Sequence, residues 1–345
     1  MSGKMKGKVS MERILAIYDV DQEYASRFAD FMNSREKLPF TAVSFTSLEK
    51  LKAYAKEHAI EILLISEEMK DQVSDIEAGQ VVALCSQEAV KREEDVSSLY
   101  KYQSGESLVR EVLARYCRQP AAAALTLLGK EAAVIGIYSP VNRCMKTSLA
   151  LTMGQLMGRS EKVLYLSFEE YSGFSRLTGE HYDQDLSDVI YLYRQQACSW
   201  LRLKAAVYSW GDLDYIPPVR YGEDLNQADP EEMARLIRML AADSGYEKIL
   251  VDVGQMGKGA LPILRICDAI YMPVRDDYIS MAKVEEFETY LKAAGGDRVL
   301  ERIRKLRLPH QGLQVRRENY MEQLLWGELG DYVRRLLRKS GTDGI

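Results

Sequence analysis

Ala132–Leu151 reads AAVIGIYSPVNRCMKTSLAL and decides how the larger part of the chain folds. Its apolar run, Val134–Tyr138, predicts a buried strand, and a short loop separates that strand from Lys146, Thr147 and an apolar helix. This order places loop amides and a helix N-terminus where they can hold phosphate, with a lysine to meet the negative charge. The stretch therefore predicts a phosphate-binding loop between a strand and a helix.

The loop departs from the usual phosphate-loop (P-loop) pattern at its glycines. That pattern has glycine six residues before the lysine and directly before it, where this chain has Pro140 and Met145. Glycine accepts positive φ, a conformation that Cys144 and Met145 tolerate poorly and Asn142 tolerates better, at about 1–2 kcal/mol for each misfit residue. Arg143 is expected to supply phosphate contacts in place of lost amides. The order of elements predicts a nucleotide site, and the loop leaves open whether nucleotide binds.

Length and composition narrow the class of protein. With 345 residues the chain can form two domains, and its 47% hydrophobic and 28% charged residues are ordinary for a globular protein. A net charge of −5 gives no strong nucleic-acid signal. Five cysteines without CxxC spacing predict reduced thiols rather than disulfides or a zinc site. No apolar run has membrane-spanning length and no signal-peptide core opens the chain, so we expect a cytoplasmic protein without a transmembrane segment.

Residues 11–118, which follow a basic tail at 1–10 that we expect to be flexible, alternate apolar runs with amphipathic segments. This alternation predicts a parallel sheet with helical crossovers, whose functional residues gather at the carboxyl ends of the strands. Those ends have the polar residues Asp19, Asp21, Ser66, Ser86 and Lys101. The expected strands are Ile14–Tyr18, Phe40–Phe45, Ile62–Ser66, Gln80–Cys85 and Ser98–Tyr102, and the expected helices are Gln22–Asn33, Leu48–His58 and Glu106–Cys117.

This segment resembles the receiver domain of bacterial response regulators, a flavodoxin-like five-stranded fold. Receivers have an acidic pair after the first strand, a phosphorylated aspartate after the third, Ser or Thr after the fourth and lysine after the fifth. Ser86 and Lys101 match, and the acidic pair is split into Asp19 and Asp21. The phosphoacceptor position has Ser66, which cannot form the acyl phosphate of receivers. The resemblance implies a receiver that is not phosphorylated and that binds partners, here called a pseudo-receiver.

Residues 119–130 are expected to form a linker, and 131–345 a second α/β domain of mostly parallel strands. Asp252 ends an apolar strand where a Walker-B carboxylate would hold Mg²⁺ through water. Glu169 follows another strand and is expected to face the same crevice, where Thr147 is the expected Mg²⁺ ligand. The expected strands are Val134–Tyr138, Lys162–Phe168, Ala205–Tyr208, Tyr215–Ile216, Glu247–Val253 and Cys267–Val274. The expected helices are Lys146–Leu156, Pro230–Ala242, Ser280–Ala294 and Tyr320–Lys339, with a helix-rich insertion from Ser187 to about Lys204.

The second domain resembles the ParA/MinD family of deviant-Walker ATPases. That family has Lys-Gly-Gly-x-Gly-Lys-Thr where this chain has Val-Asn-Arg-Cys-Met-Lys-Thr. The family's second lysine and threonine correspond to Lys146 and Thr147, and its Walker-B aspartate to Asp252. Its first lysine, which reaches the nucleotide of a dimer partner, is replaced by Val141, and its Asp-x-Asp motif becomes Ser-Phe-Glu ending at Glu169. The resemblance implies a P-loop NTPase sheet in which ATP hydrolysis is weak or lost.

Together the residues and the resemblance imply a site for ATP and Mg²⁺, with the metal on Thr147 and Asp252. The expected nucleotide-binding residues are Asn142, Arg143, Cys144, Met145, Lys146, Thr147, Ser148, Glu169 and Asp252.

A pseudo-receiver ahead of a MinD-like domain is the layout of the CpaE/TadZ group of Flp (tight adherence) pilus localisation factors. This layout implies a homodimer that works with pilus or secretion assembly proteins, at a cell pole or at the inner face of the membrane with peripheral membrane contact. Two alternatives stay open. One is an active ParA-type ATPase that positions DNA or protein cargo, and the other is a degenerate response regulator whose output domain binds protein.

Overall fold

The computed structural model describes residues 13–34, 40–86, 98–116, 131–195, 200–254, 259–309 and 320–342. By its internal contacts the chain divides into two compact units, Met1–Ala122 and Ala123–Ile345. The expected tail at 1–10 and linker at 119–130 lie outside the described residues, as do Cys117, Cys198 and His310.

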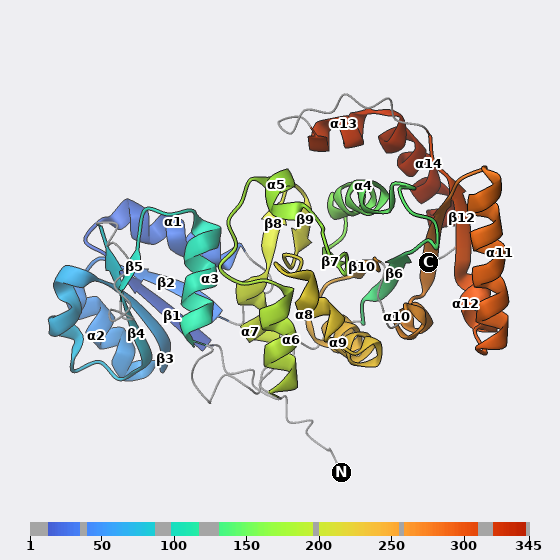
Figure 1. Ribbon diagram of the computed structural model, residues 1–345. Coiled ribbons are helices and arrows are strands. Elements are labelled where there is room, and N and C mark those ends of the chain that lie inside the picture. The colour runs from blue at the N-terminus through green and yellow to red at the C-terminus, as the bar shows by residue number, and fades with distance from the viewer. Residues whose placement is uncertain are drawn as a thin grey trace, which may run out of the picture. The chain divides into compact units, whose positions relative to one another are not determined.

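The N-terminal unit is an α/β sheet with helices between its strands (Figure 1). Its elements are β1 Arg13–Tyr18, α1 Gln22–Asn33, β2 Phe40–Phe45, α2 Leu48–Glu57, β3 Ile60–Ser66, the 3₁₀ helix Glu67–Val73, β4 Ala78–Cys85, β5 Ser98–Tyr100 and α3 Gly105–Tyr116. The five strands are parallel in the order β2-β1-β3-β4-β5. Because the chain moves from β1 to one edge and then past β1 to the other, right-handed crossovers place helices on both faces.

The strands of this unit carry apolar residues on both faces, as a doubly covered sheet requires. Ala16 and Tyr18 of β1 pack with Leu51 of α2 in one core cluster, whereas the alternate residues Leu15 and Ile17 are fully buried outside that cluster. The expected strands and helices are all present, and only the 3₁₀ helix was not foreseen. The last strand ends at Tyr100, so Lys101 lies in the turn after it rather than in the strand.

The C-terminal unit has a seven-stranded sheet in the order β12-β11-β6-β10-β7-β9-β8, parallel except for the β8–β9 hairpin. Its strands are β6 Ala133–Ile137, β7 Val163–Ser167, β8 Tyr208–Trp210, β9 Leu213–Tyr215, β10 Lys248–Asp252, β11 Ala269–Val274 and β12 Ile303–Arg307. Its helices are α4 Lys146–Gly158, α5 Phe174–Thr178, α6 Leu186–Arg194, α7 Trp200–Leu203, α8 Gly222–Asn226, α9 Pro230–Asp243, α10 Leu261–Ile266, α11 Tyr278–Ala293, α12 Asp297–Arg302, α13 Tyr320–Trp326 and α14 Glu328–Thr342. The predicted α/β class with a parallel sheet is confirmed.

Three sequence expectations for this unit were wrong in detail. The edge strand β12 was missed because its sequence, IRKLR, is mostly basic and lacks an apolar run. The segment expected to form a strand at 205–208 is largely a 3₁₀ turn, and β8 begins only at Tyr208. The expected closing helix is two helices, α13 and α14, which are separated at Gly327. Glycine suits this break, since a Cβ there would lie 2.5 Å from the Gln323 carbonyl oxygen.

The C-terminal helix α14 is strongly amphipathic, and its apolar face is used inside the unit. Leu329 and Val333 are fully buried in a cluster that includes Leu149 and Met153 of α4, and Figure 1 shows α13 and α14 beside α4. That face is therefore not available to a membrane surface while the helix is docked. Within the described residues, no helix has the length and apolar character needed to cross a membrane.

Candidate functional site

The loop between β6 and α4 has a backbone typical of a glycine-rich loop although it contains no glycine. Arg143 and Met145 have φ of 56° and 64°, and they are the described non-glycine residues with positive φ. Both stand where the ParA/MinD pattern has glycine, and Met145 directly precedes the first residue of α4. From the sequence we expected strain at Cys144 and Met145. The positive φ occurs at Arg143 and Met145, so the expectation was right for Met145 and wrong for Cys144.

The apolar members of the loop anchor it to the body of the unit. Val141 is 3% exposed and Cys144 is 6% exposed, and both pack with Met272 of β11 and Val284 of α11. The Cys144 thiol donates a hydrogen bond to the Val141 carbonyl at 3.1 Å. Val141 thus occupies the core of its own domain and is not free to pack across a dimer interface.

Lys146, the first residue of α4, is almost buried and forms an ion pair. Its Nζ lies 3.2 Å from Oε1 of Glu169, which follows β7, and the two side chains are 8% and 26% exposed. The structure therefore brings together two residues that were expected to face one crevice. The first turn of α4 carries no acidic residue, so the helix dipole adds to the positive charge there.

Asp252, the last residue of β10, is fully buried beside the same helix. Its Oδ2 accepts a 2.7 Å hydrogen bond from the Thr147 hydroxyl and a 3.3 Å bond from the Tyr165 hydroxyl. Its Oδ1 is also buried and has no hydrogen-bond partner among the described residues. Burial, assisted by the negative charge of Glu169, raises the pKa of Asp252 to about 6, although the two hydrogen bonds and the charge of Lys146 act in the opposite direction. An orphaned carboxylate oxygen beside a hydroxyl suits a cation.

The loop and the start of α4 border a pocket of about 560 Å³. Eight of its lining positions were predicted from the sequence, whereas Glu170 and Tyr171 were not. Tyr165 was also missed, because a tyrosine within an apolar strand carries no signal of its own. The hydroxyl oxygen of Tyr320, at the start of α13, lies 3.0 Å from the Ser148 Oγ. This hydrogen bond links the C-terminal helices to the site. The pocket is lined by Asn142, Arg143, Cys144, Met145, Lys146, Thr147, Ser148, Glu169, Glu170 and Tyr171.

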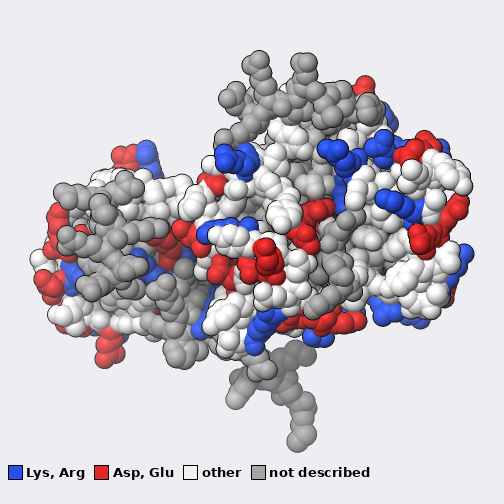
Figure 2. Space-filling view, in the orientation of Figure 1, with Lys and Arg blue, Asp and Glu red and all other residues white. Residues whose placement is uncertain are grey.

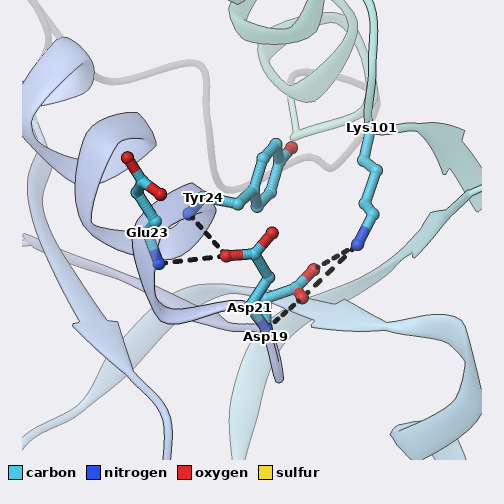
Figure 3. A network of polar contacts seen from close by, with 5 residues as sticks. All are labelled: Asp19, Asp21, Glu23, Tyr24 and Lys101. Atoms are coloured by element: carbon cyan, nitrogen blue, oxygen red, sulfur yellow. Dashed lines mark hydrogen bonds and ion pairs between the residues drawn. The ribbon is translucent and has the colours of Figure 1, made fainter.

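The N-terminal unit has its own polar cluster at the carboxyl ends of its strands (Figure 3). Asp19 is fully buried, and its two carboxylate oxygens lie 3.4 and 3.3 Å from the Lys101 Nζ. Burial lowers the pKa of Lys101, but the charge of Asp19 and its hydrogen bond outweigh that effect, so the net pKa is raised. The Lys101 Nζ also lies 5.3 Å from the centre of the Tyr24 ring, a contact that sequence reasoning missed.

The other predicted residues of this cluster have different positions. Asp21 is the N-cap of α1, where its Oδ1 accepts hydrogen bonds from two backbone amides, and its own amide donates to Asp19 at 2.9 Å. Ser66 is buried at the end of β3, and Ser86 is exposed after β4. Among the described hydrogen bonds, none joins either serine to the Asp19–Lys101 pair.

Charged side chains show no broad basic field on the face drawn in Figure 2, where Lys and Arg are mixed with Asp and Glu. Among the described residues of the whole chain, several charged side chains form ion pairs, for example Lys305 with Glu288 and Arg307 with Asp276. This mixture agrees with the net charge of −5.

Neither a protein-family model nor a curated protein matches this sequence. Similar solved structures include a ParA-family ATPase from Chlorobium tepidum, with 19% identity over 58% of this chain and 82% of that chain at a TM-score of 0.44. The septum site-determining protein MinD from Pyrococcus horikoshii, complexed with Mg-ADP, is 17% identical over 55% of this chain and 86% of that chain, with a TM-score of 0.42. The McdA–ATP complex of Cyanothece is 14% identical over 57% of this chain and 80% of that chain, with a TM-score of 0.41. With TM-scores below 0.5, these likenesses say nothing about function, which has to follow from the loop and its contacts.

Replacing Asp252 with Asn is expected to stabilise the protein in a pH-dependent way. Folding raises the pKa of this carboxyl group from 3.8 to about 6. The ionised carboxylate therefore lowers the free energy of unfolding above pH 6, and this destabilisation disappears below about pH 4, where the group is protonated in both states. Asp252→Asn should therefore raise the free energy of unfolding at pH 7.5 by on the order of 2–3 kcal/mol, and by much less at pH 4.5. Denaturant titrations at both pH values measure this, with the exposed Asp297→Asn as control. An equal change at both pH values would contradict the assignment.

A matched pair of substitutions at Arg143 tests the left-handed backbone. Both Arg143→Gly and Arg143→Ala remove the same exposed side chain, but only glycine adopts φ near 56° without strain. The glycine variant should therefore be the more stable of the two by about 1 kcal/mol, measured as the difference in free energy of unfolding. If the alanine variant were the more stable, the loop backbone would differ from the one described.

Proposed function

We propose that this chain is an assembly or localisation factor in which a ParA/MinD-like domain binds Mg-ATP and hydrolyses it weakly or not at all. The observation that carries this proposal is the loop backbone, which is left-handed at Arg143 and Met145 in spite of their side chains. That conformation turns the chain from β6 into α4 so that Lys146 and Thr147 stand at the helix N-terminus, where phosphate is favoured.

The residues at this site fit a magnesium nucleotide. The Thr147 hydroxyl and the buried, unpartnered Oδ1 of Asp252 would hold the metal, directly or through water. Bound Mg²⁺ would neutralise phosphate charge. Among the described residues, no cluster of three or more His, Cys, Asp or Glu side chains could hold a metal by itself. Phosphate oxygens would therefore have to complete the coordination, which ties metal binding to nucleotide binding.

Two substitutions relative to the ParA/MinD pattern support weak or absent ATP hydrolysis. The position of the family's first lysine has Val141, whose side chain is buried against α11 and carries no charge. The first position of the family's Asp-x-Asp motif has Ser167 instead of a carboxylate. These two substitutions remove charged groups that the ParA/MinD resemblance associates with turnover, whereas the phosphate-binding lysine remains.

The N-terminal unit is proposed to be a pseudo-receiver that binds partner proteins. Its strand order, 2-1-3-4-5, is the flavodoxin-like order, and Asp19 and Lys101 meet at the carboxyl ends of the strands. Ser66 stands where a receiver has its phosphorylated aspartate. The Lys101 ammonium, which would pair with a phosphoryl group, is already neutralised by Asp19.

The fusion of these two units favours a CpaE/TadZ-like role with Flp pilus or secretion assembly proteins. We place the protein in the cytoplasm, at a pole or at the inner face of the membrane, on that resemblance. The retained loop conformation favours one alternative, an active ParA-type ATPase that positions DNA or protein cargo. Magnesium-dependent ATP turnover by the purified chain would decide for the alternative.

Lys146→Ala should weaken Mg-ATP binding at least tenfold, about 1.4 kcal/mol, because it removes the charge at the helix N-terminus. Isothermal titration of ATP with and without Mg²⁺ measures the loss. The exposed Lys292→Ala is the control and should bind as the natural chain does. Equal affinities of the natural chain and Lys146→Ala would exclude the P-loop assignment.

Acetyl phosphate should leave no acyl phosphate on the N-terminal unit. Ser66 offers no carboxylate, and Glu67 is one residue out of register for the acceptor position. Mass spectrometry after incubation with acetyl phosphate and Mg²⁺ should show no hydroxylamine-labile phosphate. Such a label on Asp19, Asp21 or Glu67 would establish a working receiver instead.

The proposed homodimer should form without nucleotide, because Val141 cannot make the charged contact that couples pairing to ATP in the ParA/MinD family. Light scattering should show the same dimer before and after Mg-ATP is added. A monomer that pairs only with Mg-ATP would favour the active ParA-type alternative.

A further inference from the structure

The ion pair between Lys146 and Glu169 places a carboxylate where a phosphate-binding lysine would meet its ligand. Nζ and Oε1 are 3.2 Å apart, and the lysine side chain is only 8% exposed. Both residues line the 560 Å³ pocket. A ligand that reaches the lysine head group must therefore replace the carboxylate.

The backbone that carries Glu169 is held firmly in place. The Phe168 amide donates a 2.8 Å hydrogen bond to the Asp252 carbonyl, and the Glu169 amide donates to the Ser167 Oγ at 3.4 Å. Gly254 lies so close that a Cβ on it would be 2.2 Å from the Phe168 carbonyl oxygen. Displacement of the carboxylate therefore requires rotation of the Glu169 side chain rather than movement of the turn.

The charges around the pocket are balanced while the carboxylate is in place. Arg143 and Lys146 contribute two positive charges, and Glu169 and Glu170 contribute two negative charges. Of the two acids, Glu169 forms the ion pair with the lysine. Glu170 is half-buried in the same wall, which makes it a matched comparison.

We propose that Glu169 is an internal anion that determines which phosphate ligands this site accepts. The inference rests on the proposed function and adds the role of one residue to it. A single phosphate group must lose its hydration to replace a carboxylate that is already paired with the lysine, and this one contact offsets little of that cost. A diphosphate or triphosphate adds contacts to the helix N-terminus and the loop amides, so it can displace Glu169. The site therefore selects polyphosphates over monophosphates and inorganic phosphate.

The test uses isothermal titration of the full chain with inorganic pyrophosphate, Mg-ATP, AMP and inorganic phosphate. Glu169→Gln keeps the shape of the side chain and removes its charge. It should bind pyrophosphate about five- to tenfold more tightly than the natural chain and should bind inorganic phosphate and AMP measurably. Glu170→Gln removes a charge from the same wall but breaks no ion pair with the lysine, so it should improve each affinity clearly less than Glu169→Gln does.

A double-mutant cycle separates the ion pair from a general charge effect. In a Lys146→Ala background, Glu169→Gln should improve pyrophosphate binding by less than about twofold, since the lysine is no longer there to be released. As a readout without ligand, amine-reactive labelling followed by mass spectrometry should modify Lys146 faster in Glu169→Gln than in the natural chain.

The outcomes distinguish this inference from the proposed function. Equal pyrophosphate affinities of the natural chain and Glu169→Gln, or an equal gain in Glu170→Gln, would overturn the inference and leave nucleotide binding intact. Binding by Glu169→Gln but not by the natural chain supports the inference and overturns the proposed ATP binding. Absence of binding in every variant overturns both.

Discussion

The left-handed backbone at Arg143 and Met145 is the constraint on which the C-terminal site depends. Each costs about 1–2 kcal/mol relative to glycine, so other contacts must offset the strain. Burial of Val141 and Cys144 against β11 and α11 is suited to that role, because burying an aliphatic side chain contributes about 1.5–3 kcal/mol. The loop is thus held by apolar anchoring where glycine-rich loops rely on backbone freedom. The same anchoring withdraws Val141 from any contact outside its own unit.

Both units place a lysine against a carboxylate at the carboxyl ends of their strands. In the N-terminal unit the pair is Lys101 with Asp19, and in the C-terminal unit it is Lys146 with Glu169. Buried charges are tolerated when they are paired, and removing one partner leaves an expensive isolated charge. The first pair is nearly closed to solvent, whereas Glu169 is 26% exposed and can turn away. This difference in burial is the reason why the displacement by a ligand is proposed for the second pair and not for the first.

Sequence patterns were sufficient for most of the fold because the central strands are apolar runs bounded by polar turns. They failed at β12, whose basic residues hide an edge strand, and at the helix break at Gly327. The lysine, threonine and aspartate of the candidate site could be predicted because each follows a recognisable strand or loop. The Tyr165 contact, the burial of Val141 and the Lys146–Glu169 pair depend on three-dimensional packing between distant segments, so no local pattern reveals them.

The packing of α13 and α14 along α4 also affects where the chain can be shortened. These helices cover Leu149 and Met153 on α4, the helix that begins with Lys146, and the Tyr320 hydroxyl reaches Ser148 in the first turn of α4. A truncation at Pro309 would expose that apolar surface and remove the tyrosine, even though the whole sheet would be retained. Fragments and C-terminal fusions that leave out or crowd these helices are therefore poor substitutes for the full chain in binding work.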